Sequence, residues 1–178
     1  MRRLAIAALV SASALAVPAV ADATHNNGAG PQEDFVVGST RGPLVTPFGA
    51  FPAENHVNAR AIGPEVPGLG APAEGWFWAR VDFPLGPAEF RGRVRCINVV
   101  GNQSITRGVV TQSEGPGLPV GSGTIARHID NGEGAGAPPD EFVGMPTAPP
   151  SGGADCPLAP FPTAPVDQGN LVVHDAGP

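Results

Sequence analysis

Glycine and proline interrupt this chain so often that long helices have no room to form. The sequence holds 25 glycines and 22 prolines among 178 residues, together about a quarter of the chain, which is close to the low-complexity range. Short apolar runs nevertheless alternate with these glycines and prolines. No stretch after residue 23 keeps a helical period for ten residues free of both residue types. Short strands joined by turns are therefore the expected structure.

The apolar runs are separated by turn residues at short intervals. That spacing predicts an all-β fold, a single-domain antiparallel barrel or sandwich of about eight short strands. We expect strands at 34–40, 55–62, 76–83, 90–100, 103–111, 123–131, 141–145 and 170–175. Residues 146–169 hold too many prolines for a central strand and predict a Pro-rich C-terminal loop.

The N-terminus has the three-part layout of a secretory signal peptide. Two arginines precede an alanine-rich apolar stretch, and "ADA" at 21–23 is a small-x-small cleavage site. We expect cleavage after Ala23, or alternatively after Ala21, then a flexible leader over 24–33 and a secreted β domain over 34–178. Because no second apolar segment follows, we expect an extracellular protein without membrane attachment.

The net charge of the chain indicates which kinds of binding partner it is expected to have. The net charge is −6 at pH 7, and nucleic acids and anionic membranes both need clustered positive charge. We therefore expect neither as a partner, and the sequence names no other.

Two cysteines, Cys96 and Cys156, are the whole thiol content of the chain. In an oxidising compartment such a pair is expected to form a disulfide. Neither has a CxxC partner or a nearby histidine, so a metal site or a reactive thiol is the weaker interpretation.

The stretch "DNGEGAGAPPDEF" at 130–142 gathers four acids, Asp130, Glu133, Asp140 and Glu141. Counted as an EF-hand loop, its third, fifth and sixth positions are glycine, glycine and alanine, which does not match the calcium motif. A looser calcium site built from these acids and from carbonyl oxygens stays open. The simpler interpretation is a solvated turn in which Asn-Gly and the other glycines supply positive φ. We expect no metal and no cofactor.

Catalytic motifs are absent from the sequence. No histidine lies in a zinc spacing, "GSG" at 121–123 is not a nucleophile elbow, and the chain has no lysine and no tyrosine. His128 and Asp130 would share a strand face and could supply two members of a triad, but no nucleophile is nominated. We expect no enzymatic activity.

The hairpin "WFWARVDFPLGPAEFRGRVRC" at 76–96 predicts two unlike faces. If Phe83 faces Phe90, alternation places on one face Trp76, Trp78, Arg80, Asp82, Arg91, Arg93 and Arg95. The other, a core face, then carries Phe77, Ala79, Val81, Phe83, Gly92, Val94 and Cys96. The first set is either a patch for anionic or sugar-like ligands or, as we favour, an exposed face whose arginines cover two tryptophans.

The next turn, Gly101-Asn102, predicts a second hairpin. A strict register pairs Val94 with Val109 and Cys96 with Arg107, which mixes a core face with a charge. We therefore expect a bulge or a longer turn in this hairpin.

Several of these motifs together resemble one family. "FRGRVRCINVVGN", "GVVTQS", "DNGEGAGAPPDEF", a later cysteine and "GNLVVHD" are similar to small secreted β-rich bacterial proteins of unknown function, common in high-GC genomes and related to modules found beside choice-of-anchor-type domains. The resemblance spans about residues 34–175. It implies a secreted β domain and supplies no catalytic residue, and "HVNARAI" replaces the family's aromatic second strand.

The sequence as a whole favours a secreted, non-enzymatic structural or interaction module. The alternative is a small-ligand-binding β-barrel, and a secreted hydrolase is the third possibility. A packed interior would favour the first, whereas a cavity lined by a few polar groups would favour the second.

Overall fold

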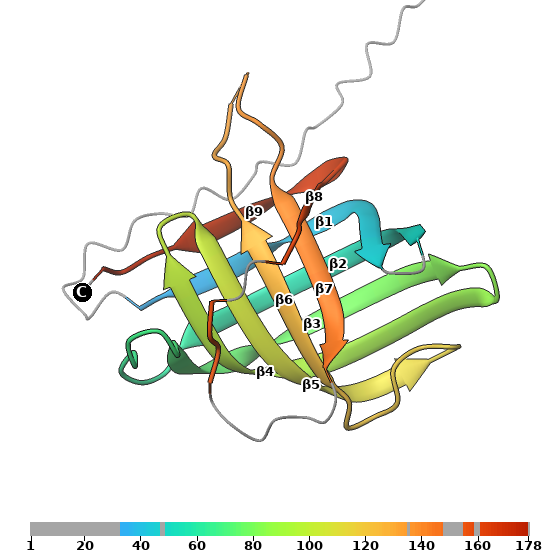
Figure 1. Ribbon diagram of the computed structural model, residues 1–178, viewed down its shortest axis with the longest axis horizontal. Helices are drawn as coiled ribbons and strands as arrows, with labels where there is room; N and C mark the ends of the chain where they lie inside the picture. Colours follow the sequence, from blue (N-terminus) through green and yellow to red (C-terminus); the bar gives the residue numbers. More distant parts are fainter. Residues whose placement is uncertain (1–32, 47–48, 135, 148–154, 159–160, 178) are drawn as a thin grey trace, which may run out of the picture. The chain divides into compact units, whose positions relative to one another are not determined.

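The structure, a computed structural model (Figure 1), describes residues 33–46, 49–134, 136–147, 155–158 and 161–177. The predicted signal peptide over 1–23 and nearly all of the predicted leader lie outside the described residues. None of the described segments is a helix long and apolar enough to cross a membrane.

The described residues form nine β-strands, which confirms the all-β prediction. All eight predicted strands are present, and a two-residue strand is added in the Pro-rich segment. The strands are β1 (Phe35–Thr46), β2 (Gly49–Ala61), β3 (Ala71–Phe83), β4 (Gly86–Val100), β5 (Gln103–Glu114), β6 (Gly123–Ile129), β7 (Glu141–Thr147), β8 (Ala164–Pro165) and β9 (Gln168–His174).

Several strands run further than predicted, and the β1–β2 hairpin shows why. Pro43 faces Pro52 across this hairpin. Pairing of β1 with β9 ends at Arg41, and pairing of β2 with β3 begins at Ala53. Neither proline therefore has to donate a ladder hydrogen bond, so both are tolerated inside a strand.

The strands form one antiparallel sheet in the order β8-β7-β6-β5-β4-β3-β2-β1-β9. Strands β1 to β7 form a meander, in which each strand lies next to the strand that follows it in the chain. The chain then crosses from β8, which pairs with β7, to β9, which pairs with β1 at the far edge. Strands β8 and β9 are separated by only two residues, so the sheet curls into a half-barrel that brings its two edges together (Figure 1).

The β3–β4 hairpin differs in register from the prediction. Phe83 lies opposite Gly86, not opposite Phe90, because Pro84 and Leu85 alone make the turn. The predicted pairs are therefore wrong by four positions on β4, and Trp78 faces Arg91 instead of Arg95. A shift by an even number does not by itself move a side chain to the other face of the sheet.

The β4–β5 hairpin contains the expected irregularity. Cys96 does pair with Arg107, and the register then shifts between Val94 and Cys96, so that Val94 faces Gly108. This bulge reverses the alternation on β4. The prediction that Cys96 shares a face with Val94 is therefore wrong: Val94 and Ile97 point into the curl of the sheet, and Cys96 points outward.

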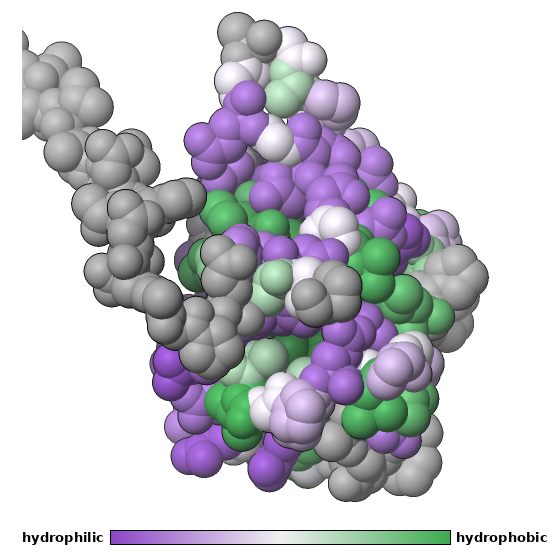
Figure 2. All heavy atoms as spheres, turned by 90° about the vertical axis from the view of Figure 1, so that its left-hand side faces the viewer, coloured by the Kyte–Doolittle hydropathy of each residue, from purple (hydrophilic) through white to green (hydrophobic). Residues whose placement is uncertain are grey.

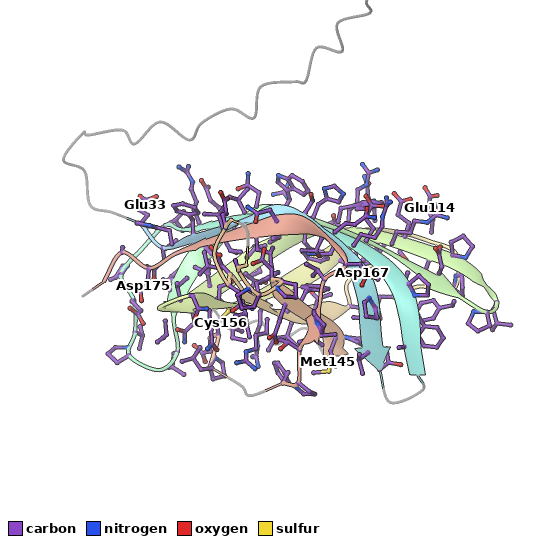
Figure 3. All side chains as sticks on the ribbon, turned by 90° about the horizontal axis from the view of Figure 1, so that it is seen from above. Glu33, Glu114, Met145, Cys156, Asp167 and Asp175 are labelled. Carbon is purple, nitrogen blue, oxygen red and sulfur yellow. A yellow bond between two sulfur atoms is a disulfide. The ribbon has the colours of Figure 1, made fainter. Side chains whose placement is uncertain are left out.

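Two apolar clusters result. The first fills the inside of the curl at the end with the β4–β5 turn, and contains Val36, Val57, Ala59, Ala61, Ala71, Ala73, Val94, Ile97, Val99 and Leu171. Seen from this end, hydrophobic residues are interspersed with hydrophilic ones (Figure 2). The second cluster lies on the outer side of β4–β6 and contains Cys96, Ile105, Ile125 and Cys156, with Met145 and Phe161 packed against it. The C-terminal segment that carries Cys156 thus covers this outer face, and Figure 3 shows Cys156 and Met145 on that side of the molecule.

Candidate functional site

A cavity of about 590 Å³ lies inside the curled sheet, and it is the candidate functional site. It lies toward the end with the β1–β2 and β3–β4 hairpins, and Pro116, Gly117 and Leu118 of the β5–β6 loop also line it. At about 30 Å³ per molecule, the volume equals that of roughly 20 waters in the liquid. Ligand cavities in proteins commonly occupy about 300–1,000 Å³, so the volume suits a small organic molecule.

Alternation along the strands explains why the cavity wall is apolar. Inward positions that line it include Leu44, Phe51, Ala53, Val57, Phe77, Ala79, Val81, Phe83, Phe90, Val94, Ala126, Phe142 and Gly144. The small members of this set leave space that the phenylalanine rings do not fill.

Phe77 shows how closely one ring is seated. A Cβ on Gly92 would lie 2.1 Å from Cζ of Phe77, and a Cβ on Gly108 would lie 2.6 Å from its Cε1. Both glycines face the inside of the sheet, so their missing side chains make room for this ring. Any larger residue at either position would therefore clash with the Phe77 ring.

The aromatic rings form pairs around the cavity. Phe51 and Phe83 meet edge to face at 5.1 Å between ring centres, and Phe77 and Phe90 do so at 6.4 Å. These geometries are the favourable ones for aromatic pairs. The rings at the hairpin end thus stabilise one another around an unfilled volume.

Polar groups on the inside are few and buried. Asn55 is 5% exposed, Thr106 is 5% exposed and His128 is 1% exposed, and all three line the cavity. The side-chain nitrogen Nδ2 of Asn55 has no hydrogen-bond partner among the described residues. A buried donor left in this state costs about 1–3 kcal/mol.

His128 is held in its neutral form. Its Nδ1 lies 3.3 Å from the hydroxyl of Ser104, and its ring lies 5.4 Å from that of Phe142. Burial lowers the pKa of His128 from 6.5 to about 4, because the charged imidazolium would be desolvated. The ring therefore adds a polar group but no charge to the cavity at neutral pH.

Two charged residues of the cavity wall direct their side chains outward. The carboxylate of Glu54 accepts a hydrogen bond from Arg41 at 2.9 Å and lies 3.2 Å from His56, and these contacts, Arg41 first, lower its pKa. Arg107 pairs with Cys96 and with Ile125, both members of the outer cluster. Paired residues point to the same face of a sheet, so Arg107 occupies an outward position of its strand.

The acid-rich segment closes the half-barrel. Asp130 accepts hydrogen bonds from the amides of Gly132 at 2.8 Å and Val173 at 3.1 Å. Asp140, 5% exposed, accepts from the amides of Asn131 at 2.9 Å and Leu171 at 2.7 Å. The Val173 and Leu171 amides belong to the edge of β9 that none of the nine described strands covers. The two carboxylates thus accept the hydrogen bonds that a neighbouring strand would otherwise accept at this edge of β9.

The other two acids of the segment also have protein partners. Glu133 accepts from the side chain of Asn170 at 3.0 Å, and Glu141 accepts from the hydroxyl of Thr163. Within the described ranges, no group of three or more His, Cys, Asp or Glu side chains is placed to hold a metal ion. The geometry of these four acids is that of a structural turn.

His128 and Asp130, the pair considered for a triad, are not brought together as a catalytic unit. His128 points inward to Ser104, whereas both oxygens of Asp130 accept backbone amides in the loop and in β9.

Cys96 and Cys156 are disulfide-bonded, with the sulfur atoms 2.00 Å apart. The carbonyl of Cys156 accepts a hydrogen bond from the side chain of Asn98 at 2.9 Å, and its amide donates to the carbonyl of Leu69 at 2.6 Å. The link therefore fastens the C-terminal segment to the outside of β4 and to the β2–β3 loop.

The arginine and tryptophan face lies outside, as alternation predicts. Trp78 donates to Glu89 at 2.6 Å, and Arg91 lies 3.3 Å from the same oxygen. Arg80 pairs with Asp82 at 3.2 Å. The charges of Arg80 and Arg91 are thus paired within this face, as they are on a solvated surface.

The sequence carries a local signal for Asn55, although none for the cavity itself. Residues Asn55, Val57, Ala59 and Ala61 alternate with polar residues, so Asn55 stands on the core face of a predicted strand. A polar residue at such a position is a candidate for ligand contact.

Comparison of the chain with protein-family models, with curated proteins and with solved structures finds no match in any of the three. The resemblance to small secreted β-rich proteins stays a prediction. A function is therefore inferred from the cavity.

Proposed function

We propose that the protein binds a small apolar molecule inside its curled sheet. The observation that carries the proposal is the cavity of about 590 Å³ whose inward-facing wall is mostly aromatic and aliphatic. An apolar molecule gains free energy by leaving water for such a wall, about 25 cal/mol for each Å² of apolar surface buried.

The interior was the feature expected to separate the two leading interpretations of the sequence. A cavity with a few buried polar groups supports the small-ligand binder over the structural or interaction module. The chain's lack of a nominated nucleophile and the separate roles of His128 and Asp130 give a hydrolase no comparable support.

The test is a titration with the uncharged fluorophore N-phenyl-1-naphthylamine, whose emission rises in apolar surroundings. We expect saturable binding to the purified chain. Ala126→Phe adds a ring at an inward position that lines the cavity and should weaken binding at least tenfold. Ala137→Phe makes the same change on the exposed β6–β7 loop and should leave the affinity within twofold.

Urea unfolding of each variant checks that the fold is retained. An absence of saturable binding, or an equal loss of affinity in both variants, would contradict the proposal. A structural or interaction role would then be the better hypothesis.

A further inference from the structure

We propose that the ligand is an uncharged lipophile with an oxygen acceptor, such as a ketone, ester or alcohol, which takes a hydrogen bond from the side chain of Asn55. This inference rests on the proposed binding function and adds the chemical class of the ligand.

The first support is the absence of charge on the cavity's inner face. Of the described residues that line the cavity, only Glu54 and Arg107 carry a formal charge at neutral pH, and both stand at outward positions of their strands. A carboxylate or an ammonium group inside would lose its hydration without meeting a counter-ion. Burying an unpaired charge is strongly unfavourable, so the cavity should reject charged ligands.

The second support is the unused donor of Asn55. The residue stands on β2 between Thr40 of β1 and Ala79 of β3. It is 95% buried, lines the cavity, and leaves Nδ2 without a partner among the described residues. A native fold rarely retains such a buried donor unless something satisfies it. An oxygen acceptor on a bound lipophile supplies that bond.

The third support is that a second polar group, His128, adds a hydrogen-bonding site without a charge. Its ring is neutral at pH 7.5 because burial lowers its pKa to about 4, and it lies on the inner face with Thr106. A neutral imidazole can accept or donate one hydrogen bond through a ring nitrogen. It cannot neutralise a carboxylate.

The experiment compares four ligands that share a straight twelve-carbon chain: the alkane, the methyl ketone, the primary alcohol and the carboxylate. Each displaces N-phenyl-1-naphthylamine from the full chain at pH 7.5. We expect the ketone and the alcohol to bind at least tenfold more tightly than the carboxylate. The ketone should also bind about fivefold or more tightly than the alkane, the range expected for one hydrogen bond.

Asn55→Leu removes the donor and keeps a side chain of similar size. It should abolish the advantage of the ketone over the alkane and leave the alkane affinity within twofold. Asn58→Leu, the same change at an exposed position on the outer face of β2, should preserve that advantage.

The possible failures are distinguishable. If the fluorophore does not bind at all, both the proposed function and the ligand class are wrong. If it binds but the carboxylate displaces it as well as the ketone does, cavity binding stands and the uncharged class is wrong. If the ketone keeps its advantage in Asn55→Leu, the assignment of Asn55 as the donor is wrong. The comparison of ketone and carboxylate needs no variant, so poor folding of Asn55→Leu would still leave the ligand class tested.

Discussion

The two ends of the curled sheet are built from similar residues, yet one is packed and the other is hollow. At the end with the β4–β5 turn, Val36, Ile97 and Leu171 are each 0% exposed and belong to one continuous cluster. At the end with the β1–β2 and β3–β4 hairpins, Leu44 and Phe83 are only half-buried and border a cavity of about 590 Å³.

The difference lies in how the sheet closes, not in how apolar its inner face is. Strand β9 covers the edge of β1 from Phe35 to Arg41 and no further. Beyond Arg41, the rest of β1 runs on without that partner and the sheet stays open at this end. At the closed end, Ala59, Ala61, Ala71 and Ala73 allow the layers to approach closely. Closure at one end alone therefore produces a half-barrel with a fixed core and a neighbouring cavity.

The largest expected effect comes from the disulfide, which fastens the closed end from outside. Cys96 and Cys156 are separated by 60 residues, and the chain-entropy account gives such a link about 4 kcal/mol. The double variant Cys96→Ala/Cys156→Ala should lose that amount in urea unfolding, yet still bind the neutral fluorophore. Free-thiol titration of the denatured, unreduced wild type should find none. Two titratable thiols would show that the disulfide does not form. The closed end would then have no covalent bond that fastens it from outside.

Core truncations compare the ends directly. Ile97→Ala deletes a fully buried side chain at the packed end and should cost about 3.5 kcal/mol, the middle of the usual range. Leu44→Ala, at the wall of the cavity, should cost less than about 1.5 kcal/mol, because the side chain is already half-exposed. Equal losses in urea unfolding would show that the hairpin end is packed as well.

The closing edge gives a third comparison. Asp140→Ala leaves the amides of Leu171 and Asn131 without their carboxylate acceptor, and should cost about 3 kcal/mol because both bonds are to a charged group. Glu133→Ala, on the exposed part of the same loop, should cost about 0.5 kcal/mol or less. If the two variants were equally stable, the carboxylate of Asp140 would not be what holds β9.

The pH dependence of stability tests the buried ring. The folded-state pKa of His128 is about 4, whereas the unfolded chain takes up the proton near pH 6.5. The unfolded state therefore binds more protons between these values, and stability falls as pH falls through this window. From pH 7.5 to pH 5 the loss attributable to His128 is about 2 kcal/mol. His128→Gln should remove that part of the slope, and an unchanged slope would show that the ring is solvated.

Calcium should have the smallest effect. The four acids of residues 130–141 already accept hydrogen bonds from the protein. The thermal midpoint should therefore be the same in millimolar calcium and in excess chelator. A site of micromolar affinity would add about 4 kcal/mol under these conditions. A chelator-reversible rise would identify the loop as a calcium site.

The strands and most of their faces could be predicted from the sequence. The glycines and prolines of the turns and the alternation of apolar and polar residues along a strand are both local signals. The prediction failed where a single residue changes the alternation. The bulge at Arg95 moved Cys96 from the predicted core face to the outside. The turn at Pro84-Leu85 is shorter than predicted, so the predicted pairs in this hairpin are wrong although the shift itself leaves the faces unchanged. Neither the length of a turn nor the position of a bulge is determined by alternation alone.

The cavity could not be predicted, because it depends on strands that are distant in the sequence. Whether Asn55 and His128 face a packed core or open space depends on where β9 stops along β1. The role of Asp130 and Asp140 could not be predicted for the same reason. The local sequence predicts the turn, but the contact between this turn and β9 forms only when the sheet curls.

A crystal structure of the chain grown with N-phenyl-1-naphthylamine would show directly whether the cavity binds a ligand. We expect ligand density on the inner face between the phenylalanine rings of the hairpin end, with the packed end unchanged around Ile97 and Leu171. A hairpin end whose rings have collapsed to fill the space, or a ligand bound only on the outer face, would contradict it.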